Sequence, residues 1–257
     1  MSNLWATREQ RRPHLPKDEL DRYVDEFGKT SADLEAQLKD GPIEVVGQIE
    51  NSSNYTFLVT VGDKRRAIYK PTDGERPLHD FPAGLHKREV GAYEFSKLVG
   101  WHLVPPTVER DGPFGIGSVQ AFVDADFTEH YLTLLPHDKY RGALQQLCAL
   151  DYIMNNTDRK SGHCLLGKHI WAIDNGLCFH SQFKLRTVIW DFAGQPVPAS
   201  HLESLKGIEL AKVRTALEPY LDSLEVSATL DRLALLLDAE EFPQDETGGH
   251  RYPWPPI

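Results

Sequence analysis

The stretch DYIMNNTDRKSGHCLLGKHIWAIDNGLCF, residues 151–179, decides the fold. It follows a helical pattern and contains two apolar runs, 164–166 and 169–173, with the composition of short strands. Only Gly167 and Lys168 separate the runs, and a glycine in this position is typical of a two-residue type II′ hairpin turn. We therefore expect a hairpin at the centre of this stretch.

The turn sets the register of the hairpin and the positions of three polar side chains. Residues whose numbers sum to 335 pair in this register, so His163 lies opposite Ala172. Asp174 then returns beside the start of the first strand, within reach of Asp158 and His163. These side chains are expected to converge at the mouth of the hairpin.

Two aspartates in this arrangement suit phosphoryl transfer. That reaction needs one aspartate to orient or deprotonate the acceptor hydroxyl and another to hold magnesium against the nucleotide phosphates. Asp158 suits the first role and Asp174 the second. An aspartate before a turn, or an Asp-Asn-Gly after a strand, is also ordinary turn chemistry. The combination with the helix and the hairpin favours the catalytic interpretation.

The sequence before residue 124 predicts an antiparallel sheet with one inserted helix. The helix is expected from about Pro82 to Val99, with Asp80 as its N-cap and Gly100 at its end. A sheet with one helix is how a small nucleotide-binding lobe is built. The strands are expected at 43–49, 55–61, 65–70, 107–109 and 116–123.

The remaining segments predict mostly helices. Short amphipathic helices are expected from Lys17 to Leu38, ended by Asp40 and Gly41. Further helices are expected at 140–155, 198–205, 208–224 and 227–237. The predicted fold class is α+β, a two-lobed kinase-like fold. It comprises an N-terminal helical extension (1–42), a nucleotide-binding lobe (43–123), a mainly helical catalytic lobe (124–241) and an irregular tail (242–257).

Composition excludes several classes of protein. The 257 residues carry a formal net charge of −10 and no dense basic block, which argues against nucleic acid or an anionic bilayer as a partner. No apolar run has the length of a membrane span or the form of a signal peptide, so we expect no integral membrane association. Three cysteines without a CxxC pair indicate a reducing, cytoplasmic setting.

Two motifs carry a resemblance to a known family. Asn156-Thr157-Asp158-Arg159 and Ile173-Asp174-Asn175-Gly176-Leu177 resemble the catalytic and metal-binding loops of type II phosphatidylinositol 4-kinases. The chain is similar to an actinobacterial branch of the phosphatidylinositol 3/4-kinase superfamily over about residues 47–179. Its resemblance to HipA-type and secretory-pathway kinases extends only to the general layout. The resemblance implies an ATP-dependent kinase.

The resemblance also implies roles in the first lobe. Lys70 matches the strand lysine that grips the α- and β-phosphates, and Glu89 matches the helix glutamate that pairs with it. The residues themselves agree, because a lysine that closes an apolar strand is poorly placed for a surface role. Glu94 is a nearby rival for Glu89.

Two further segments are expected to contact ATP. The loop at 50–55 lies where kinases place a phosphate-covering turn, although it is not glycine-rich. The segment 120–123 has the position of the hinge whose backbone holds adenine. The candidate nucleotide-binding residues are therefore Ser52, Ser53, Asn54, Lys70, Gln120, Phe122 and Val123.

One position departs from the kinase pattern. His163 stands where a kinase loop usually has asparagine, five residues after Asp158. An imidazole favours manganese more than an asparagine does, so the expected cofactors are ATP with Mg²⁺ or Mn²⁺. If His163 is a ligand, activity should fall as the pH drops through the imidazole pKa, near 6.5. A structural histidine is the alternative, and a transition-metal site with Cys164, Cys178 and His180 is disfavoured because strand cysteines are usually buried.

The sequence does not determine the chemical identity of the phosphoryl acceptor. The cysteine-rich stretch and basic surface of the type II lipid kinases are not visible, which favours a soluble polyol, an inositol-type molecule or a protein hydroxyl over a membrane phosphoinositide. Lys184, Arg186 and Trp190 are placed either to bind an anionic or inositol-like group or to act as ordinary residues around a buried strand. The alternatives to a kinase are a nucleotide-binding pseudokinase and an AMP-transferring enzyme.

Overall fold

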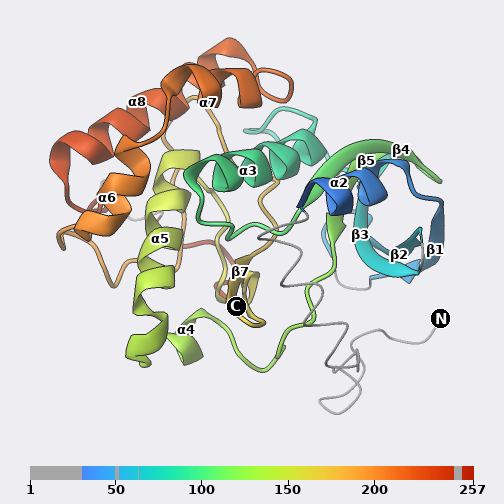
Figure 1. Ribbon diagram of the computed structural model, residues 1–257, viewed down its shortest axis with the longest axis horizontal. Coiled ribbons are helices and arrows are strands. Elements are labelled where there is room, and N and C mark those ends of the chain that lie inside the picture. Colours follow the sequence, from blue (N-terminus) through green and yellow to red (C-terminus); the bar gives the residue numbers. More distant parts are fainter. Residues whose placement is uncertain (1–30, 50–51, 63, 246–250) are drawn as a thin grey trace.

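The computed structural model describes residues 31–49, 52–62, 64–245 and 251–257. An antiparallel sheet forms one lobe and a group of helices forms the other, with helix α3 (Leu85–Val99) between them (Figure 1). Each lobe has its own hydrophobic core, and α3 contributes to that of the larger lobe. This is the predicted two-lobed α+β architecture.

The sheet has five strands in the order β1-β2-β3-β5-β4, all antiparallel. In β3 the side chains of Ala67 and Tyr69 are buried in the core, so Lys70 points to the opposite face. Gly117 lies opposite Pro71, and a Cβ there would stand 2.3 Å from the Lys70 carbonyl oxygen. The strands are β1 (Ile43–Gln48), β2 (Phe57–Val61), β3 (Arg65–Pro71), β4 (Thr107–Gly112) and β5 (Gly115–Ala121).

Helix α2 (Ser31–Asp40) packs against the sheet and against α3. Leu34 and Leu38 are buried in the core of the small lobe, and the Glu35 carboxylate lies 2.6 Å from the Lys97 ammonium of α3. The expected end at Asp40 is confirmed, whereas the helical pattern predicted from Lys17 to residue 30 lies outside the described residues. Helix α2 therefore packs as a layer of the small lobe.

The start of α3 differs from the prediction. Its N-cap is Gly84, with φ 93°, and neither Asp80 nor Pro82 belongs to the helix. The Glu75 carboxylate accepts hydrogen bonds from the N–H groups of Gly84 and His86, each at 2.9 Å. A carboxylate is stabilised at a helix N-terminus, so a side chain from the preceding loop sets where this helix begins.

The larger lobe is built on α5 (Asp138–Met154), which Asn155 ends in a left-handed conformation with φ 53°. The predicted helix at 208–224 is instead α7 (Leu210–Leu217) followed by a break, because Asp222 caps a new helix with its side chain.

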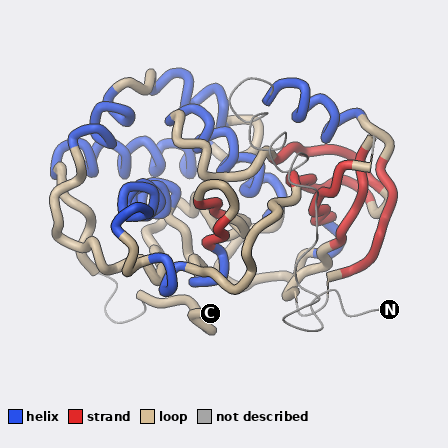
Figure 2. Tube along the Cα trace, turned by 60° about the horizontal axis from the view of Figure 1, so that its bottom comes forward, coloured by secondary structure: helices blue, strands red, loops and turns tan. Residues whose placement is uncertain are grey.

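No helix in the described ranges is both long and apolar enough to cross a membrane. Figure 2 shows the helices around a small hairpin. The other elements are α4 (Tyr131–Leu134), α6 (Ala199–Lys206), α8 (Ser223–Ala239), β6 (Cys164–Leu166) and β7 (Ile170–Ala172).

The hairpin β6–β7 forms as expected, but its register differs by one residue. Cys164 pairs with Ala172, so the numbers of paired residues sum to 336, and the connection has three residues. The Gly167 N–H donates to the His169 carbonyl at 3.0 Å, and Gly167 does not have the positive φ that a type II′ turn requires. His169 thus lies in the turn, and its ring centroid lies 3.8 Å from that of Trp171.

Candidate active site

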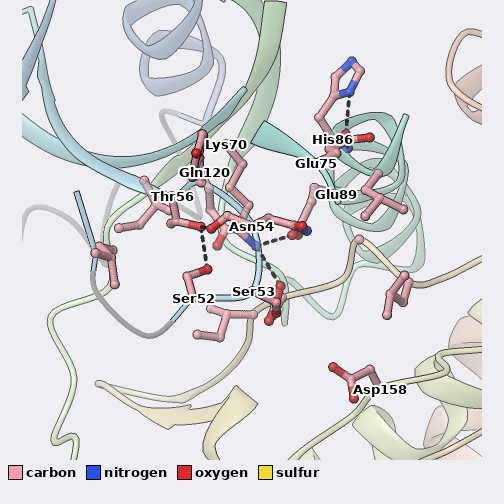
Figure 3. A pocket seen from close by; sticks show the side chains of 18 of the residues that line it. Ser52, Ser53, Asn54, Thr56, Lys70, Glu75, His86, Glu89, Gln120 and Asp158 are labelled. Atoms are coloured by element: carbon pink, nitrogen blue, oxygen red, sulfur yellow. Dashed lines mark hydrogen bonds and ion pairs between the residues drawn. The ribbon is translucent and has the colours of Figure 1, made fainter. Parts of the chain in front are cut away.

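A cavity of about 470 Å³ lies between the sheet and the hairpin. Lys70 reaches into it from the sheet, Glu89 from α3 and Asp158 from the far side (Figure 3). His163 does not line this cavity but lies directly behind Asp174. The structure thus brings nearly all predicted site residues to one place: Ser52, Ser53, Asn54, Lys70, Glu89, Gln120, Phe122, Val123, Asp158 and Asp174.

Lys70 joins the two lobes through ion pairs. Its ammonium contacts the Glu89 carboxylate and lies 2.8 Å from Asp174 Oδ1. Burial opposes the charge, but the two carboxylates outweigh it and raise the pKa of Lys70 well above its ordinary value. Glu94 lies 4.0 Å from Lys97 instead, so the predicted partner is Glu89 and not its rival.

Asp174 follows β7 with a left-handed backbone, φ 59°. Its side chain is 51% exposed, and the neighbouring Lys70 lowers the pKa of its carboxyl well below the usual range. A non-glycine residue in this conformation is uncommon and is found where the surrounding structure enforces it. Here the conformation presents an ionised carboxylate to the cavity.

His163 contacts Asp174 on the side away from Lys70. Its Nε2 lies 3.4 Å from Asp174 Oδ2, and its Nδ1 accepts a 3.4 Å hydrogen bond from the Lys160 N–H. Burial lowers the pKa of the imidazole to about 4, so the ring is neutral at physiological pH. An acid limb from this residue would therefore lie below the unperturbed value of about 6.5, because the folded environment disfavours the charged form.

Asp174 and His163 offer one carboxylate and one neutral imidazole to a metal ion. Within the described ranges, no cluster of three or more His, Cys, Asp or Glu residues is placed to hold one. Magnesium in kinases is bound through one or two protein ligands together with substrate phosphates. The donor set therefore fits a divalent ion that arrives with a nucleotide.

Asp158 lies on an irregular loop after α5. Its backbone N–H donates to the Asn156 side chain at 2.9 Å, and its carboxylate lies 3.2 Å from the Lys160 ammonium. Burial raises the pKa of the Asp158 carboxyl to about 6, against the lowering effect of Lys160. A carboxylate with a raised pKa that is still partly exposed is suited to accept a proton.

Behind the cavity lies a buried cluster that sequence reasoning assigned no role. The Arg159 guanidinium is fully buried, donates to both Asp151 oxygens at 2.9–3.1 Å, and also donates to Asn175 Oδ1 at 2.6 Å. It thereby ties α5, the Asp158 loop and the Asp174 loop together. Arg159 belongs to the motif at 156–159, but its buried partners are 8 and 16 residues away and leave no local sign in the sequence.

The loop predicted to cover phosphates is held to the sheet. The Ser52 hydroxyl lies 2.9 Å from that of Thr56, and Asn54 Oδ1 accepts from the Arg76 N–H. Residues 50 and 51 of this loop lie outside the described residues. Ser53 and Asn54 line the cavity.

The predicted hinge also lines the cavity. Gln120 uses its side-chain amide to donate to the Thr107 hydroxyl at 2.9 Å, and the Phe122 N–H donates to the Arg66 carbonyl. Since the Gln120 backbone lies within the paired strand β5 and the Phe122 N–H is already engaged, Val123 is the predicted residue whose backbone we expect to meet adenine.

The other residues considered from the sequence, two basic residues and two cysteines, lie in different parts of the large lobe. Lys184 donates to the Asp80 carbonyl at 2.8 Å, whereas Arg186 lines a second cavity beside Asp158. Cys164 and Cys178 are fully buried in the core of the large lobe, and burial raises the pKa of the Cys164 thiol to about 12. Cys164 is a packing residue, as expected for a strand cysteine, and Cys178 is buried in the same core.

The fold is similar to that of solved kinase structures. The Golgi casein kinase superposes with a TM-score of 0.64 at 17% identity, covering 98% of this chain and 85% of that one. Its structure with Mn/ADP bound gives 0.62 at 15% identity, with coverages of 93% and 85%. The hydra Fam20 structure with sugar gives 0.61 at 13% identity, with coverages of 80% and 87%. At these identities the likeness shows the fold alone.

Sequence comparison shows the family. Residues 102–205 match the family described as "Phosphatidylinositol 3- and 4-kinase". Protein Rv2133c of Mycobacterium tuberculosis is 38% identical over 266 residues, covering 87% of this chain and 95% of that protein. The chain belongs to the phosphatidylinositol 3- and 4-kinase family, in a branch with this mycobacterial protein.

Proposed function

We propose that the protein is an ATP-dependent kinase that transfers the γ-phosphoryl group to a hydroxyl acceptor. The observation that carries the proposal is the convergence of Lys70, Glu89, Asp174 and Asp158 on one cavity. A lysine positioned by a glutamate, an ionised aspartate and a second aspartate with a raised pKa are the groups that phosphoryl transfer requires.

In the proposed reaction, ATP occupies the cavity with adenine at Val123 and its phosphates between Lys70 and the loop of Ser53. Lys70 neutralises charge on the α- and β-phosphates, and Glu89 holds its side chain in place. Asp158 accepts the proton of the acceptor hydroxyl as its oxygen bonds to the γ-phosphorus. The bond from that phosphorus to the β–γ bridging oxygen breaks, and ADP leaves.

A divalent cation, magnesium or manganese, would be held by Asp174 and His163. It supplies Lewis-acid neutralisation of the phosphate charge. As the ring stands, Nδ1 accepts a hydrogen bond, so the proton lies on Nε2, which faces Asp174. The 3.4 Å bond to Nδ1 is long and weak, and binding of a metal at Nε2 would require the other tautomer. The Golgi casein kinase structure with Mn/ADP supports a nucleotide and a divalent ion in this fold.

The proposed acceptor is a soluble polyol, an inositol-type molecule or a protein hydroxyl in preference to a membrane phosphoinositide. Hydra Fam20 was crystallised with a sugar, and the Golgi casein kinase is named for a protein substrate, so the fold accommodates both kinds. No helix of the described residues spans a membrane, and the net charge of −10 opposes an anionic bilayer.

Labelled ATP tests the proposal against its alternatives. The protein is incubated with γ-labelled or α-labelled ATP, Mg²⁺ or Mn²⁺, and a mixture of polyols and dephosphorylated casein. We expect γ-label in an acceptor and no α-label. Transfer of the α-label would establish AMP transfer instead, and nucleotide binding without transfer of either label would establish a pseudokinase. An Asp158→Asn variant is the control for contaminating kinases.

A further inference from the structure

The side chain of Gln120 lies on the face of the small-lobe sheet that lines the cavity (Figure 3). Its neighbours in β5, Val119 and Ala121, are buried in the core on the other face. Gln120 pairs with Ile68, two residues before Lys70 in β3. Residues of a strand are about 3.4 Å apart, so Gln120 lies about 7 Å along the sheet from the Lys70 position. It therefore lies between the lysine proposed to hold phosphates and the hinge expected to hold the base.

A chain of hydrogen bonds fixes which end of the Gln120 amide faces the cavity. The Pro105 carbonyl can only accept, so the Thr107 hydroxyl donates its single proton to it, at 2.8 Å. The Thr107 oxygen must then accept the 2.9 Å bond from Gln120, which places the nitrogen of the amide towards Thr107. Thr107 is 1% exposed, so water does not compete for these bonds. The amide is thus held with its nitrogen towards β4 and its oxygen away from it.

The amide oxygen of Gln120, Oε1, is left available to a ligand. It has no hydrogen-bond partner within residues 31–49, 52–62, 64–245 and 251–257. Gln120 is buried, yet Oε1 is not among the described side-chain atoms that are sealed from solvent without a partner. Oε1 is therefore accessible from the cavity that Gln120 lines. Since buried polar groups are almost always paired, an acceptor with a fixed orientation at this wall indicates a donor on the ligand.

We propose that Gln120 Oε1 accepts a hydrogen bond from the 6-amino group of the nucleobase, and that Thr107 makes the site select adenine by fixing the amide. The inference rests on the proposed function, which puts ATP in this cavity, and names the residues that set the choice of base. Hypoxanthine and guanine carry a carbonyl oxygen at position 6, which would face Oε1 as one acceptor against another. A turned amide could offer its nitrogen to that oxygen, but turning it would break the bond to Thr107. A site that leaves a buried polar group unpaired rejects the wrong ligand strongly.

Binding of nucleoside diphosphates tests the inference without turnover. The ligands are ADP, inosine diphosphate and purine riboside diphosphate, which has only hydrogen at position 6. Their dissociation constants are measured by competition with a ribose-labelled fluorescent ADP in the presence of Mn²⁺. We expect wild type to bind ADP about 10- to 100-fold more tightly than inosine diphosphate, because two acceptors are opposed in the latter. The preference over purine riboside diphosphate should be about fivefold or more, the size of one lost hydrogen bond.

Paired variants assign the preference to each residue. Gln120→Leu removes the acceptor and should abolish the preference for ADP over purine riboside diphosphate, whereas Gln120→Glu keeps an acceptor and should retain part of it. Thr107→Val keeps the size of the side chain but frees the amide to turn, so the preference for ADP over inosine diphosphate should fall about threefold or more. Thr107→Ser keeps the hydroxyl and should restore that preference. Leu235→Ala, at an exposed position on α8 that does not line the cavity, is the control for an unrelated side chain.

Several outcomes overturn the inference. Equal binding of ADP and purine riboside diphosphate to wild type does so, as does a full preference for ADP in Gln120→Leu. Equal selectivity in Thr107→Val and Thr107→Ser would also reject it, because the hydroxyl would not set the amide; this pair decides the matter if Gln120→Leu does not fold. Failure of wild type to bind any of the nucleotides would reject the proposed kinase function as well. Selective binding of ADP by a protein that transfers no γ-label would reject the kinase proposal alone and retain the selection of adenine.

Discussion

Two charged clusters lie back to back in this molecule, and they differ in their access to water. The front cluster, Lys70, Glu89 and Asp174, opens to the cavity, with the Lys70 and Asp174 side chains 24% and 51% exposed. The rear cluster, Asp151, Arg159 and Asn175, is buried almost completely. The clusters touch, because the Asn175 N–H donates to Glu89 Oε2 at 2.9 Å.

The difference in exposure indicates that the two clusters have different roles, although both are held together by ion pairs and hydrogen bonds. Ion pairs at a solvent-accessible surface contribute little to stability, so Lys70 can exchange Asp174 for nucleotide phosphates at low cost. Buried pairs are strongly destabilising to break, because one charge is left without a partner in a low-dielectric interior. We therefore expect changes at the cavity to alter activity and changes in the rear cluster to alter stability.

The largest effect is expected for Asp158, which lies on the cavity side of both clusters. Asp158→Ala removes the proposed base and should lower the rate of transfer by roughly 100- to 10,000-fold. Nucleotide binding should persist, since Asp158 acts on the acceptor. Single-turnover kinetics and titration with a fluorescent ATP analogue measure the two quantities. A variant that still transfers at the wild-type rate would move the base to another residue.

Arg159→Met should have its main effect on stability. It leaves the Asp151 carboxylate buried without its partner, which we expect to cost about 3–5 kcal/mol of unfolding free energy. Urea unfolding measures the loss, and Asp151→Asn combined with Arg159→Met should recover part of it. If the single variant unfolds at the same urea concentration as wild type, the rear cluster does not hold the loops together.

Lys70 and Glu89 of the front cluster were assigned from the resemblance to kinases, and all three members also belong to short local patterns. Lys70 closes an alternating strand, Glu89 lies on the face of the following helix, and Asp174 follows an apolar run with a turn motif. The five strands and Asp158 also belong to local patterns of this kind. Period and turn chemistry operate within a few residues, which is the range that a single sequence displays.

The errors arose where a side chain from elsewhere decides the local geometry. Glu75 caps α3 from a preceding loop and displaces the predicted cap at Asp80. One error is local: the hairpin turn includes His169 and has three residues instead of two, which shifts the hairpin register. The rear cluster depends on contacts between distant parts of the chain, for which the sequence has no local sign.

Lys70→Met tests the front cluster directly. Loss of a charged contact to phosphate should lower kcat/KM for ATP by about 10- to 100-fold. The urea midpoint should change far less than in Arg159→Met, because the partners of Lys70 retain water or the Asn175 N–H. Unaltered ATP turnover in a folded variant would contradict the assignment of the small lobe.

The pH dependence should report Asp158. Its carboxyl has a raised pKa of about 6, so a fall in pH through 6 protonates the group and removes the base. The rate should then decrease up to about tenfold per pH unit on the acid side. Lys160→Met removes a neighbour that lowers this pKa, so the acid limb should move to higher pH. A limb that stays in place would mean that another group controls it.

His163→Asn is expected to have the smallest effect. It tests whether His163 ligates the divalent ion proposed to bind at Asp174 of the front cluster. An imidazole ligand favours manganese over magnesium relative to an amide oxygen, so the variant should shift the ratio of the two activities towards magnesium by about threefold or more. The acid limb should not move, because burial keeps the pKa of His163 near 4, well below that of Asp158. Steady-state rates with each metal, measured from pH 5 to 8, provide both readouts. The Leu235→Ala protein is again the control for an unrelated side chain. Equal metal preference in wild type and His163→Asn would mean that the ring only orients Asp174 and never ligates the ion.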